Sequence, residues 1–549
     1  MCPYIFKVLE ITETMKRITC LFISAFFLAG GVAYAQGEMD AYKMSQTDLN
    51  GTARYLGMSG AFGALGGDIS SMSTNPAGLG IYRSSEVVTT ISLSSIKANT
   101  NWNGSKADES KTRFNFDNIA YVGYFPTGND EGIVGWNLGV SYNRVKSFNR
   151  TYRMNGAQAY SLADYAADLA YGIPEKDLQL VKGGYDPYFD SRSPWLSVLG
   201  YEAGFFDPNQ EGGSEYHSAF GKQGSNGWEA YSPQNVDLLV NEKGSIGQYN
   251  FSFATNISDR VFLGATVAVT DMDYSLKTKY TEDFSTVDQL WMDNGLTTDG
   301  TGYAFNIGAI VRPADFLRLG VAYNSPTWYK LTDYFHGEAQ TIINNKAWDV
   351  ASTPDYQSGS YHLRTPDRWI FSAAGVGKNF LVSVDYELTN YKRMNLNDLD
   401  GNDLQSTDDI KKDFGMSGTL KVGAEVKITP QFSVRAGTLW RTSPMKQHVK
   451  DGISPQKADG TYYADAVGIV GTIPNYTVDK GTNSYSIGLG YRFTPSFYAD
   501  LACVYREYKE DAYAFPSTFR ENGEVFVKSD PASLKTKTTQ VALTLGYKF

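Results

Sequence analysis

Charged side chains alternate with apolar ones in several segments of the sequence, and two arginines share one such segment. Arg435 and Arg441 both fall on the odd-numbered face of a segment that begins at Phe432. A guanidinium binds a carboxylate through paired N–H donors, so this pair and Lys421 are our candidate contacts for the carboxylate of a ligand. The other interpretation is a structural network across a polar interior. The remaining charged residues at comparable positions are Arg318, Arg368, Lys427, Arg492, Asp385, Glu387, Glu425 and Asp500.

Residue types suited to catalysis are present, but their arrangement is not catalytic. The histidines lie in or beside predicted loops, no Ser or Asp stands at a spacing typical of a triad, and no pair has the spacing of a zinc-binding helix. We therefore expect no enzyme, no cofactor and no metal site. Haem binding by loop histidines stays open as an alternative, although no His-rich tract favours it. The four histidines are His217, His336, His362 and His448.

Strands must position these charges, and residues 539–549 show the strand pattern most clearly. Val541, Leu543 and Leu545 share one face, whereas the other face is small or polar. An apolar face that ends in aromatic residues is typical of a strand that closes a membrane barrel, so Tyr547 and Phe549 are our candidate barrel-assembly signal. Taken alone, the segment also fits a strand of an ordinary sandwich.

The same alternation recurs from Glu86 onward and predicts the fold. We count fourteen strands, in which short turns alternate with long loops. This rhythm predicts an all-β protein, a 14-stranded antiparallel transmembrane β-barrel spanning residues 86–549, with its short turns facing the periplasm. The long loops are expected near residues 97–112, 148–244, 277–300, 331–360, 393–415, 446–481 and 509–534.

Composition narrows the class further. The 549 residues contain one long apolar run, at 18–32, which is too few for a helical membrane protein. Basic residues precede the run and small residues follow it, so we predict a cleaved signal peptide at 1–35 with the true start at Met15. The net charge of −10, without a basic run, argues against nucleic acid as a partner. Cys503 is then the single cysteine left, which excludes an intramolecular disulfide.

Two segments depart from the strand pattern. Residues 36–85 are rich in glycine and contain Asn75-Pro76-Ala77-Gly78. Small residues let backbones approach each other closely, so this segment is predicted to form a hatch, or plug, inside the barrel. A phosphate loop is disfavoured, because no Gly-Lys-Ser/Thr sequence follows the glycines. The insertion at 148–244 carries a helical pattern at 157–171 and is predicted to be a long, partly helical extracellular loop.

These features together resemble the FadL/TodX family of outer-membrane transporters for long-chain fatty acids and aromatic hydrocarbons. The resemblance covers essentially the whole mature chain, and its most specific part is the Asn75-Pro76-Ala77-Gly78-Leu79 element after Gly51-Thr52-Ala53-Arg54. It also includes Gly423-Ala424-Glu425 and Arg435-Ala436-Gly437 in a late hairpin.

The resemblance implies a mechanism and its residues. Asn75, Pro76, Ala77 and Gly78 would belong to the hatch, the loop at 148–244 would help to build a capture groove, and a kink in the third strand would open a lateral exit into the membrane. Gly135 and Gly139 are the residues of that strand most able to permit a kink. Glycine on an inward face also makes room for a plug, and both interpretations stay open.

We therefore expect passive uptake of a hydrophobic small molecule, such as a long-chain fatty acid, across the outer membrane of a Gram-negative bacterium. The expected partners are this ligand, outer-membrane lipid and the barrel-assembly machinery, and the protein is expected to be a monomer. One alternative is a general or small-solute pore, although general porins lack a glycine-rich hatch. Another is a haem or aromatic hydrocarbon receptor on the same barrel.

Overall fold

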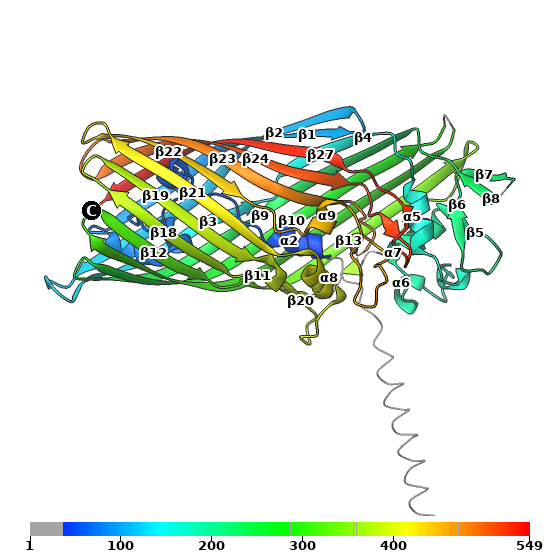
Figure 1. Cartoon of the computed structure of the whole chain (residues 1–549), viewed down its shortest axis with the longest axis horizontal. Helices are drawn as coiled ribbons and strands as arrows, with labels where there is room; N and C mark the ends of the chain where they lie inside the picture. Colours follow the sequence, from blue (N-terminus) through cyan, green and yellow to red (C-terminus); the bar gives the residue numbers. More distant parts are fainter. Residues whose placement is uncertain (1–36, 226, 286, 355, 358, 470) are drawn as a thin grey trace, which may run out of the picture.

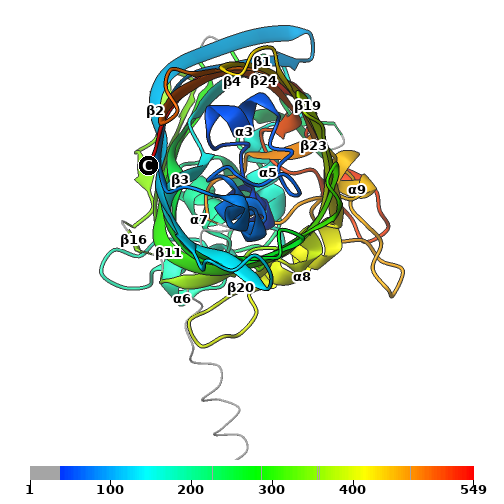
Figure 2. The same cartoon turned by 90° about the vertical axis from the view of Figure 1, so that its left-hand side faces the viewer.

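The computed structural model describes residues 37–225, 227–285, 287–354, 356, 357, 359–469 and 471–549. The predicted signal peptide, with its start at Met15 and its cleavage site, lies outside these residues. The described chain forms a closed, 14-stranded antiparallel barrel with the N-terminal segment inside and helical loops at one end (Figure 1, Figure 2). This confirms the predicted fold class. No helix among the described residues is long and apolar enough to cross a bilayer.

The barrel wall follows the chain order, and each strand runs antiparallel to the next. The last strand, β27, pairs with β1 over nearly the whole length of both and closes the barrel. The fourteen wall strands are β1 (Glu86–Trp102), β2 (Ser105–Pro126), β3 (Ile133–Ser147), β9 (Asn235–Ile257), β10 (Val261–Asp283), β11 (Gln289–Ala314), β12 (Leu317–Asn324), β18 (Arg368–Val376), β19 (Phe380–Asn390), β21 (Met416–Lys427), β22 (Phe432–Arg441), β23 (Tyr476–Arg492), β24 (Phe497–Tyr513) and β27 (Ala532–Lys548).

Near the short turns, every wall strand presents apolar side chains outward, as lipid contact requires. Aromatic residues border this apolar band on both sides. The upper girdle consists of the exposed residues Phe114, Tyr249, Tyr303, Trp369, Tyr386, Trp440, Tyr485 and Tyr505, and the lower girdle of Phe125, Phe316, Phe380, Phe493, Phe497, Tyr547 and Phe549. The upper girdle lies roughly eight residues along the strands from the short turns, which corresponds to about 20 Å for tilted strands.

Above the upper girdle the apolar face of the strands changes sides. In β10, Leu263 and Val267 point outward below the girdle, whereas Met272 and Tyr274 are buried inside above it. The strands there are long, with 23 residues in β9, 23 in β10 and 26 in β11. Since about 10 tilted residues cross a membrane, the upper half of these strands stands outside it.

Three of the predicted long loops are mostly strand in the structure, and one of them, residues 331–360, contains most of β13 (Trp328–Ile343) and three further short strands. Residues 97–112 belong mostly to β1 and β2, which are joined by a tight turn at Asn103 and Gly104, and residues 277–300 belong mostly to β10 and β11. In these stretches the outward side chains are polar and the inward ones are mostly apolar, which reverses the pattern of the membrane-facing part.

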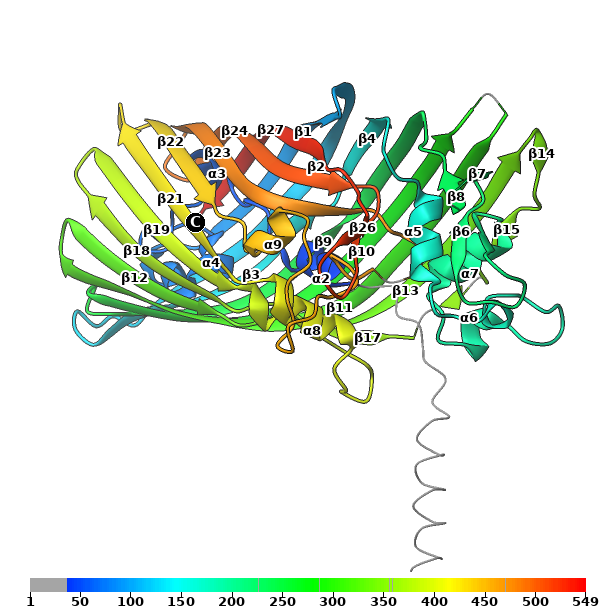
Figure 3. The ribbon, with the colours of Figure 1, turned by 45° about the vertical axis from the view of Figure 1, so that its right-hand side comes forward.

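Loops fill the extracellular half of the barrel and pack into a large apolar core, which we call the cap. The insertion contributes α5 (Leu162–Leu169), η2 (Glu175–Asp177), α6 (Pro187–Asp190), α7 (Trp195–Glu202), β5 (Phe206–Pro208), β6 (Tyr216–Ser218), β7 (Gly221–Gly224) and β8 (Gly227–Ala230). Figure 3 shows these elements gathered at one end of the barrel. The helix predicted within 157–171 is α5, whose first turn is capped by Ser161 and Asp164.

The other loop elements extend the wall or lie beside the mouth. They are β4 (Arg150–Gly156), β13 (Trp328–Ile343), β14 (Lys346–Ala347), β15 (Ala351–Ser352), β16 (Tyr356–Gln357), β17 (Tyr361–Arg364), η3 (Tyr391–Arg393), β20 (Asn395–Asn397), α8 (Gln405–Asp413), α9 (Gln447–Lys450), β25 (Thr518–Phe519) and β26 (Val525–Val527). Among them, β4 continues the line of β3 along β9, and β13 continues β12 along β11.

The N-terminal segment runs down the lumen from the cap side. It begins with α2 (Glu38–Ser45), passes through residues 46–50, which we call the linker, and continues as residues 51–85, which we call the plug. The plug contains α3 (Ala53–Gly57), α4 (Ser71–Thr74) and η1 (Pro76–Ile81), and α3 is visible inside the ring of strands in Figure 2.

Candidate functional site

The plug sits against glycines of the barrel wall. A methyl group on Gly264 of β10 would lie 2.3 Å from the Pro76 carbonyl carbon, and one on Gly320 of β12 would lie 2.4 Å from the Gly63 oxygen. Such distances are far below van der Waals contact, so no larger residue fits without a shift. The same close approach to plug backbone recurs at Gly423 and Gly437, whereas Gly308 faces the Asn75 side chain. The plug therefore contacts the wall at the level of its backbone.

Asn75 joins the plug to the wall. Its Nδ2 donates to the Gly63 oxygen at 2.6 Å and to the Ala309 oxygen of β11 at 3.3 Å, and its Oδ1 accepts from the Ala77 N–H at 3.2 Å. The last contact caps η1, and Pro76 stands at the first position of that helix. Asn75, Pro76, Ala77 and Gly78 are all buried at this interface.

Arg435 is buried in a network of ion pairs. Its Nε lies 2.6 Å from Glu425 Oε2, and its Nη1 lies 2.5 Å from Asp500 Oδ1. Arg54 of the plug reaches the same Glu425 oxygen at 3.0 Å. Arg435 thus faces the lumen and belongs to the network that links plug to wall. Its guanidinium is already paired with two carboxylates.

A cavity of about 350 Å³ lies between the plug and the cap. Its walls come from α2, the linker and the inward faces of strands around the barrel, among them β2, β3, β9, β21 and β22. The charged residues that line it include nine cations, Lys43, Arg113, Arg144, Lys146, Arg150, Arg368, Lys421, Arg441 and Arg506, against five carboxylates, Asp40, Asp48, Glu242, Glu387 and Glu510. Among the described residues, cations thus predominate in this cavity.

Arg441 and Lys421 both line this cavity, unlike Arg435. Lys421 Nζ lies 3.1 Å from Glu387 Oε2. Arg441 Nη2 donates to Thr482 Oγ1 at 3.1 Å and lies 3.8 Å from the Asp479 carboxylate, while its Nε is buried and makes no hydrogen bond within the described part of the chain. Arg441 therefore has the greater capacity to accept a further anion.

A second group of charges holds α2 to the wall above the upper girdle. Glu242 of β9 accepts ion pairs from Arg150 and Lys43, each at 2.8 Å. Burial raises the pKa of Glu242, but Arg150 and Lys43 outweigh burial and bring that pKa to about 2. The Glu242 carboxylate is therefore ionised at neutral pH and is already matched by its neighbours.

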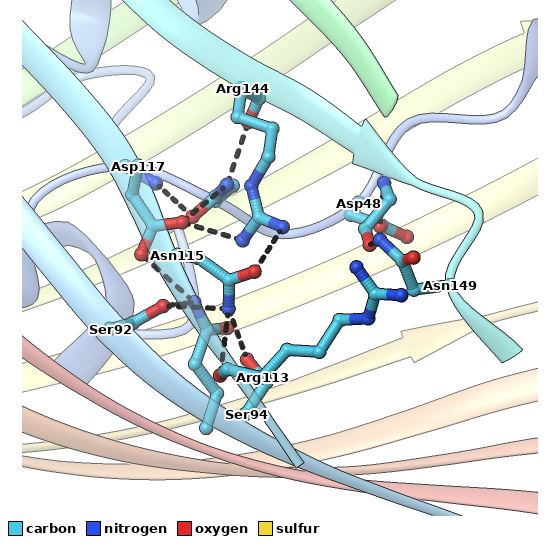
Figure 4. Close-up of polar contacts among 12 residues, drawn as sticks. Asp48, Ser92, Ser94, Arg113, Asn115, Asp117, Arg144 and Asn149 are labelled. Carbon is cyan, nitrogen blue, oxygen red and sulfur yellow. Dashed lines mark hydrogen bonds and ion pairs between the residues drawn. The ribbon is translucent and has the colours of Figure 1, made fainter. Parts of the chain in front are cut away.

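The barrel seam between β2 and β3 is paired only in its lower part. Register pairs run from Asn118–Asn143 to Pro126–Gly135, and the described residues of β2 above them pair with β1 alone. Both edges are irregular at the level where pairing stops, with Asp117 bulged in β2 and a register shift between Arg144 and Lys146 in β3. An ion pair of 2.6 Å between Arg144 and Asp117 joins the two edges there (Figure 4). The seam between β2 and β3 is thus unpaired above the upper girdle, where the described residues of β4 approach β1 and β2 without pairing with them, and we call this unpaired stretch the open part of the seam.

The two third-strand glycines lie below this opening. Gly139 is in regular register with Val122, and a methyl group there would lie 2.4 Å from Met72 Cε of the plug. Gly135 borders a second register shift, between Ile133 and Gly135, near the lower end of the strand. The strand irregularity next to the open part of the seam is therefore at Arg144–Lys146, while Gly139 makes room for the plug.

Arg113 was not among the residues selected from the sequence. It lies on the inner face of β2, in the open part of the seam, and lines the cavity. Its guanidinium makes no hydrogen bond or ion pair to any described residue, and its Nε is buried. In Figure 4 its side chain extends toward the side on which Asp48 and Asn149 lie. A sequence signal was available, since continuing the alternation of Phe114 and Phe116 upward places Arg113 on the inner face.

The chain end completes the wall. Tyr547 and Phe549 are exposed in the lower girdle, and the Phe549 N–H donates to the Ser85 oxygen at 3.0 Å, next to the start of β1. Among the described residues, no group of three or more His, Cys, Asp or Glu side chains has an arrangement that could hold a metal ion.

Comparison with known proteins finds a family that resembles part of the chain. Residues 244–484 match the family model described as outer membrane protein transport protein (OMPP1/FadL/TodX). A 47 kDa outer membrane protein of Pasteurella multocida (strain Pm70) is 22% identical over 259 residues, which cover 46% of this chain and 52% of the relative. The matched part thus spans about half the length of that relative.

Solved structures share the fold. A Pseudomonas aeruginosa FadL homologue superposes with a TM-score of 0.51 at 14% identity, covering 92% of this chain and 99% of the homologue. A TodX monoaromatic hydrocarbon channel, in its deltaS2 mutant form, gives a TM-score of 0.50 at 12% identity, covering 91% of this chain and all of that one. Residues 244–484 are thus similar to the family of outer membrane protein transport proteins (OMPP1/FadL/TodX), and the whole barrel shares its fold with a solved FadL homologue.

Proposed function

We propose that the protein takes up hydrophobic compounds that carry an acidic group, such as long-chain fatty acids, across the outer membrane. The observation that carries this proposal is the cavity between plug and cap, in which nine cations face five carboxylates. A neutral hydrocarbon offers nothing to offset the desolvation of these charges, whereas a carboxylate does. The volume of about 350 Å³ suits one medium-sized amphiphile.

The proposed route begins at the cap and ends at the seam. Residues 36–85 act as the hatch, residues 86–549 form the barrel, and the insertion at about 148–244 helps to capture the ligand outside the membrane. The backbone-level seating of the plug on wall glycines closes the direct way down. The proposed lateral exit is the lowest point of the unpaired β2–β3 seam, at the upper girdle, where the opening borders the outer edge of the lipid. No energy source is needed, because the ligand moves from water toward an apolar phase.

Within this route, Arg441, Lys421 and Arg113 are the proposed contacts for the ligand carboxylate. All three line the cavity, and Arg113 has no partner among the described residues. Arg435 is assigned a structural role instead, because two carboxylates already surround it.

The test is native mass spectrometry of the detergent-purified protein, followed by lipid extraction and a binding assay with dodecanoate and dodecanol. We expect an acidic lipid to co-purify and dodecanoate to compete for its place, with dodecanoate binding more tightly than dodecanol. An empty protein that binds neither probe and conducts ions steadily in a planar bilayer would instead indicate a pore.

A further inference from the structure

One carboxylate of the protein itself occupies a ready-made anion site in the cavity wall. Oδ1 of Asp48 lies 3.2 Å from Arg506 Nη1 and 3.6 Å from Lys146 Nζ, and Oδ2 accepts the backbone N–H of Ser147 at 2.9 Å. Two cations and one peptide N–H around a single carboxylate is how proteins hold an acidic ligand. Lys146, Ser147 and Arg506 all line the cavity, so the site faces the proposed ligand path.

Asp48 belongs to the linker, which has no regular secondary structure of its own. The linker is attached to the irregular part of β3 by the Asp48 N–H, which donates to the Val145 oxygen at 2.8 Å, and by Asn50 Nδ2, which donates to the Arg144 oxygen at 2.7 Å. These contacts fall on the register shift of β3, at the edge of the open seam. The Asp48 carboxylate thus fastens the start of the plug to the proposed exit.

We propose that Lys146, Arg506 and the Ser147 N–H form the anion-binding site of the transport path, and that Asp48 occupies it as an internal competitor. The carboxylate of an incoming amphiphile replaces Asp48 in this site. The inference rests on the proposed function, and it adds the site, its resident anion and the exchange between them.

The exchange is favoured by charge balance. Removing Asp48 alone would leave two largely buried cations without a counter-charge, which is costly. When a second carboxylate enters as the first one leaves, the cations stay paired throughout. Arg113, whose guanidinium has no described partner, offers the ligand a first contact while Asp48 is still bound. Arg506 Nη2 also donates to the Leu49 oxygen of the linker at 2.9 Å, so the exchange of carboxylates takes place on a residue that binds the linker backbone.

Exchange at this site also couples ligand binding to the seam. Once the Asp48 side chain leaves Ser147, the linker keeps fewer bonds to β3 than before, and the edge of the seam loses part of its inner support. By linkage, whatever loosens the linker strengthens ligand binding, and the ligand loosens the linker by the same factor.

The first experiment compares Asp48→Asn with the wild-type, full-length protein in detergent. Since the amide is a weaker competitor for two cations, we expect dodecanoate to bind about tenfold more tightly and dodecanol to bind unchanged. The matched control is Asp40→Asn, which removes one negative charge from the same cavity without touching the site. It is expected to change dodecanoate affinity less than about twofold.

A double-mutant cycle then tests whether the gain arises at this site. In an Arg506→Gln background, Asp48→Asn should tighten dodecanoate binding much less than it does in wild type, because one of the two cations for which both carboxylates compete is gone. Hydrogen exchange supplies an independent readout. Amides of residues 46–50 should exchange faster in Asp48→Asn than in wild type, and dodecanoate should speed their exchange in wild type but dodecanol should not.

The outcomes separate the two proposals. If dodecanol and dodecanoate both bind but Asp48→Asn changes neither, or tightens both equally, the competitor role of Asp48 is overturned while the proposed function stands. If the wild-type protein binds neither probe, the proposed function fails and this inference falls with it.

Discussion

Single cations in the lumen differ in whether they already have a carboxylate partner. Arg435 is held between Glu425 and Asp500, whereas Arg113 has no described partner and faces the cavity. Removing Arg435 would leave two buried carboxylates facing each other, which costs stability. Removing Arg113 breaks no described contact. Both arginines lie on inward faces of strands, but loss of Arg435 is expected to lower the stability of the barrel, whereas loss of Arg113 is expected to leave that stability unchanged.

We predict that Arg113→Gln weakens dodecanoate binding roughly fivefold to tenfold, since a charge-assisted hydrogen bond is lost. Dodecanol binding and the heat stability of the barrel should not change. Lys111→Gln is the matched control, because Lys111 lies on the same face of β2 but does not line the cavity. Isothermal titration calorimetry measures both variants, and an equal loss for both would show that only the general positive field matters.

At the level of elements, the fit between plug and wall depends on glycines in neighbouring strands. Gly264 of β10, Gly308 of β11 and Gly320 of β12 lie on adjacent strands and receive the Asn75-Pro76-Ala77 backbone and the turn at Gly63. Gly375, also in the wall, has no such neighbour. A methyl group on Gly375 of β18 would meet nothing within 4 Å.

We predict that Gly308→Ala destabilises the plug by about 1–3 kcal/mol, because the new methyl group would lie 2.0 Å from Asn75 Oδ1. Gly375→Ala is expected to be neutral. Thermal unfolding in detergent and limited proteolysis of residues 51–85 would measure the difference. Resistance of the plug to protease in Gly308→Ala at the wild-type level would contradict this account of its seating.

At the scale of the whole molecule, the cap closes the mouth through buried groups whose charge depends on pH. Glu282 of β10 accepts the N–H of Leu162 at the start of α5 at 2.8 Å, and burial raises the pKa of its carboxyl from 4.5 to about 7. An acid with a raised pKa keeps its proton in the folded cap and loses it on opening, so the cap is most stable below pH 4.5. That stability falls as the pH rises toward 7, by an amount on the order of 3 kcal/mol.

We therefore predict that Glu282→Gln lowers the population of the opened α5 about a hundredfold at pH 8 and only a few-fold at pH 5. Hydrogen exchange of residues 160–170 reports this opening, provided that variant and wild type are compared at the same pH. Glu338→Gln serves as the control, because the Glu338 side chain is 48% exposed on β13. If Glu282→Gln lowered this population equally at both pH values, the carboxyl would not be the source of the effect.

The sequence pattern predicted the membrane half of the barrel better than the rest. Leu263, Val267 and Val269 alternate with their side chains outward, as lipid contact requires. Counting such segments gives the number of strands, and the gaps between them give the short turns. Above the girdle, Met272, Tyr274 and Leu276 keep the period but on the other face, because they pack against the cap instead of lipid. The reversed phase has the composition of a loop, so residues 277–300 were expected to be one.

The candidate site was predicted less completely than the fold. Alternation places Arg435, Lys421 and Arg441 on inward faces, but it cannot tell which cation has a carboxylate beside it. That depends on the strand register, as in the contacts of Arg435 with Glu425 and Asp500. The role of Asp48 could not be predicted, since nothing in the local sequence marks one carboxylate of an irregular linker as the partner of Lys146 and Arg506.

The length of the strands decides where this protein meets its ligand. With 26 residues in β11, of which about 10 are needed to cross the bilayer, the mouth stands roughly 40 Å above the lipid. An apolar molecule outside the barrel would cross the same distance in water before it reached the bilayer. On the proposed route, the raised barrel encloses this distance, so its length shortens the path that an apolar solute travels in contact with water.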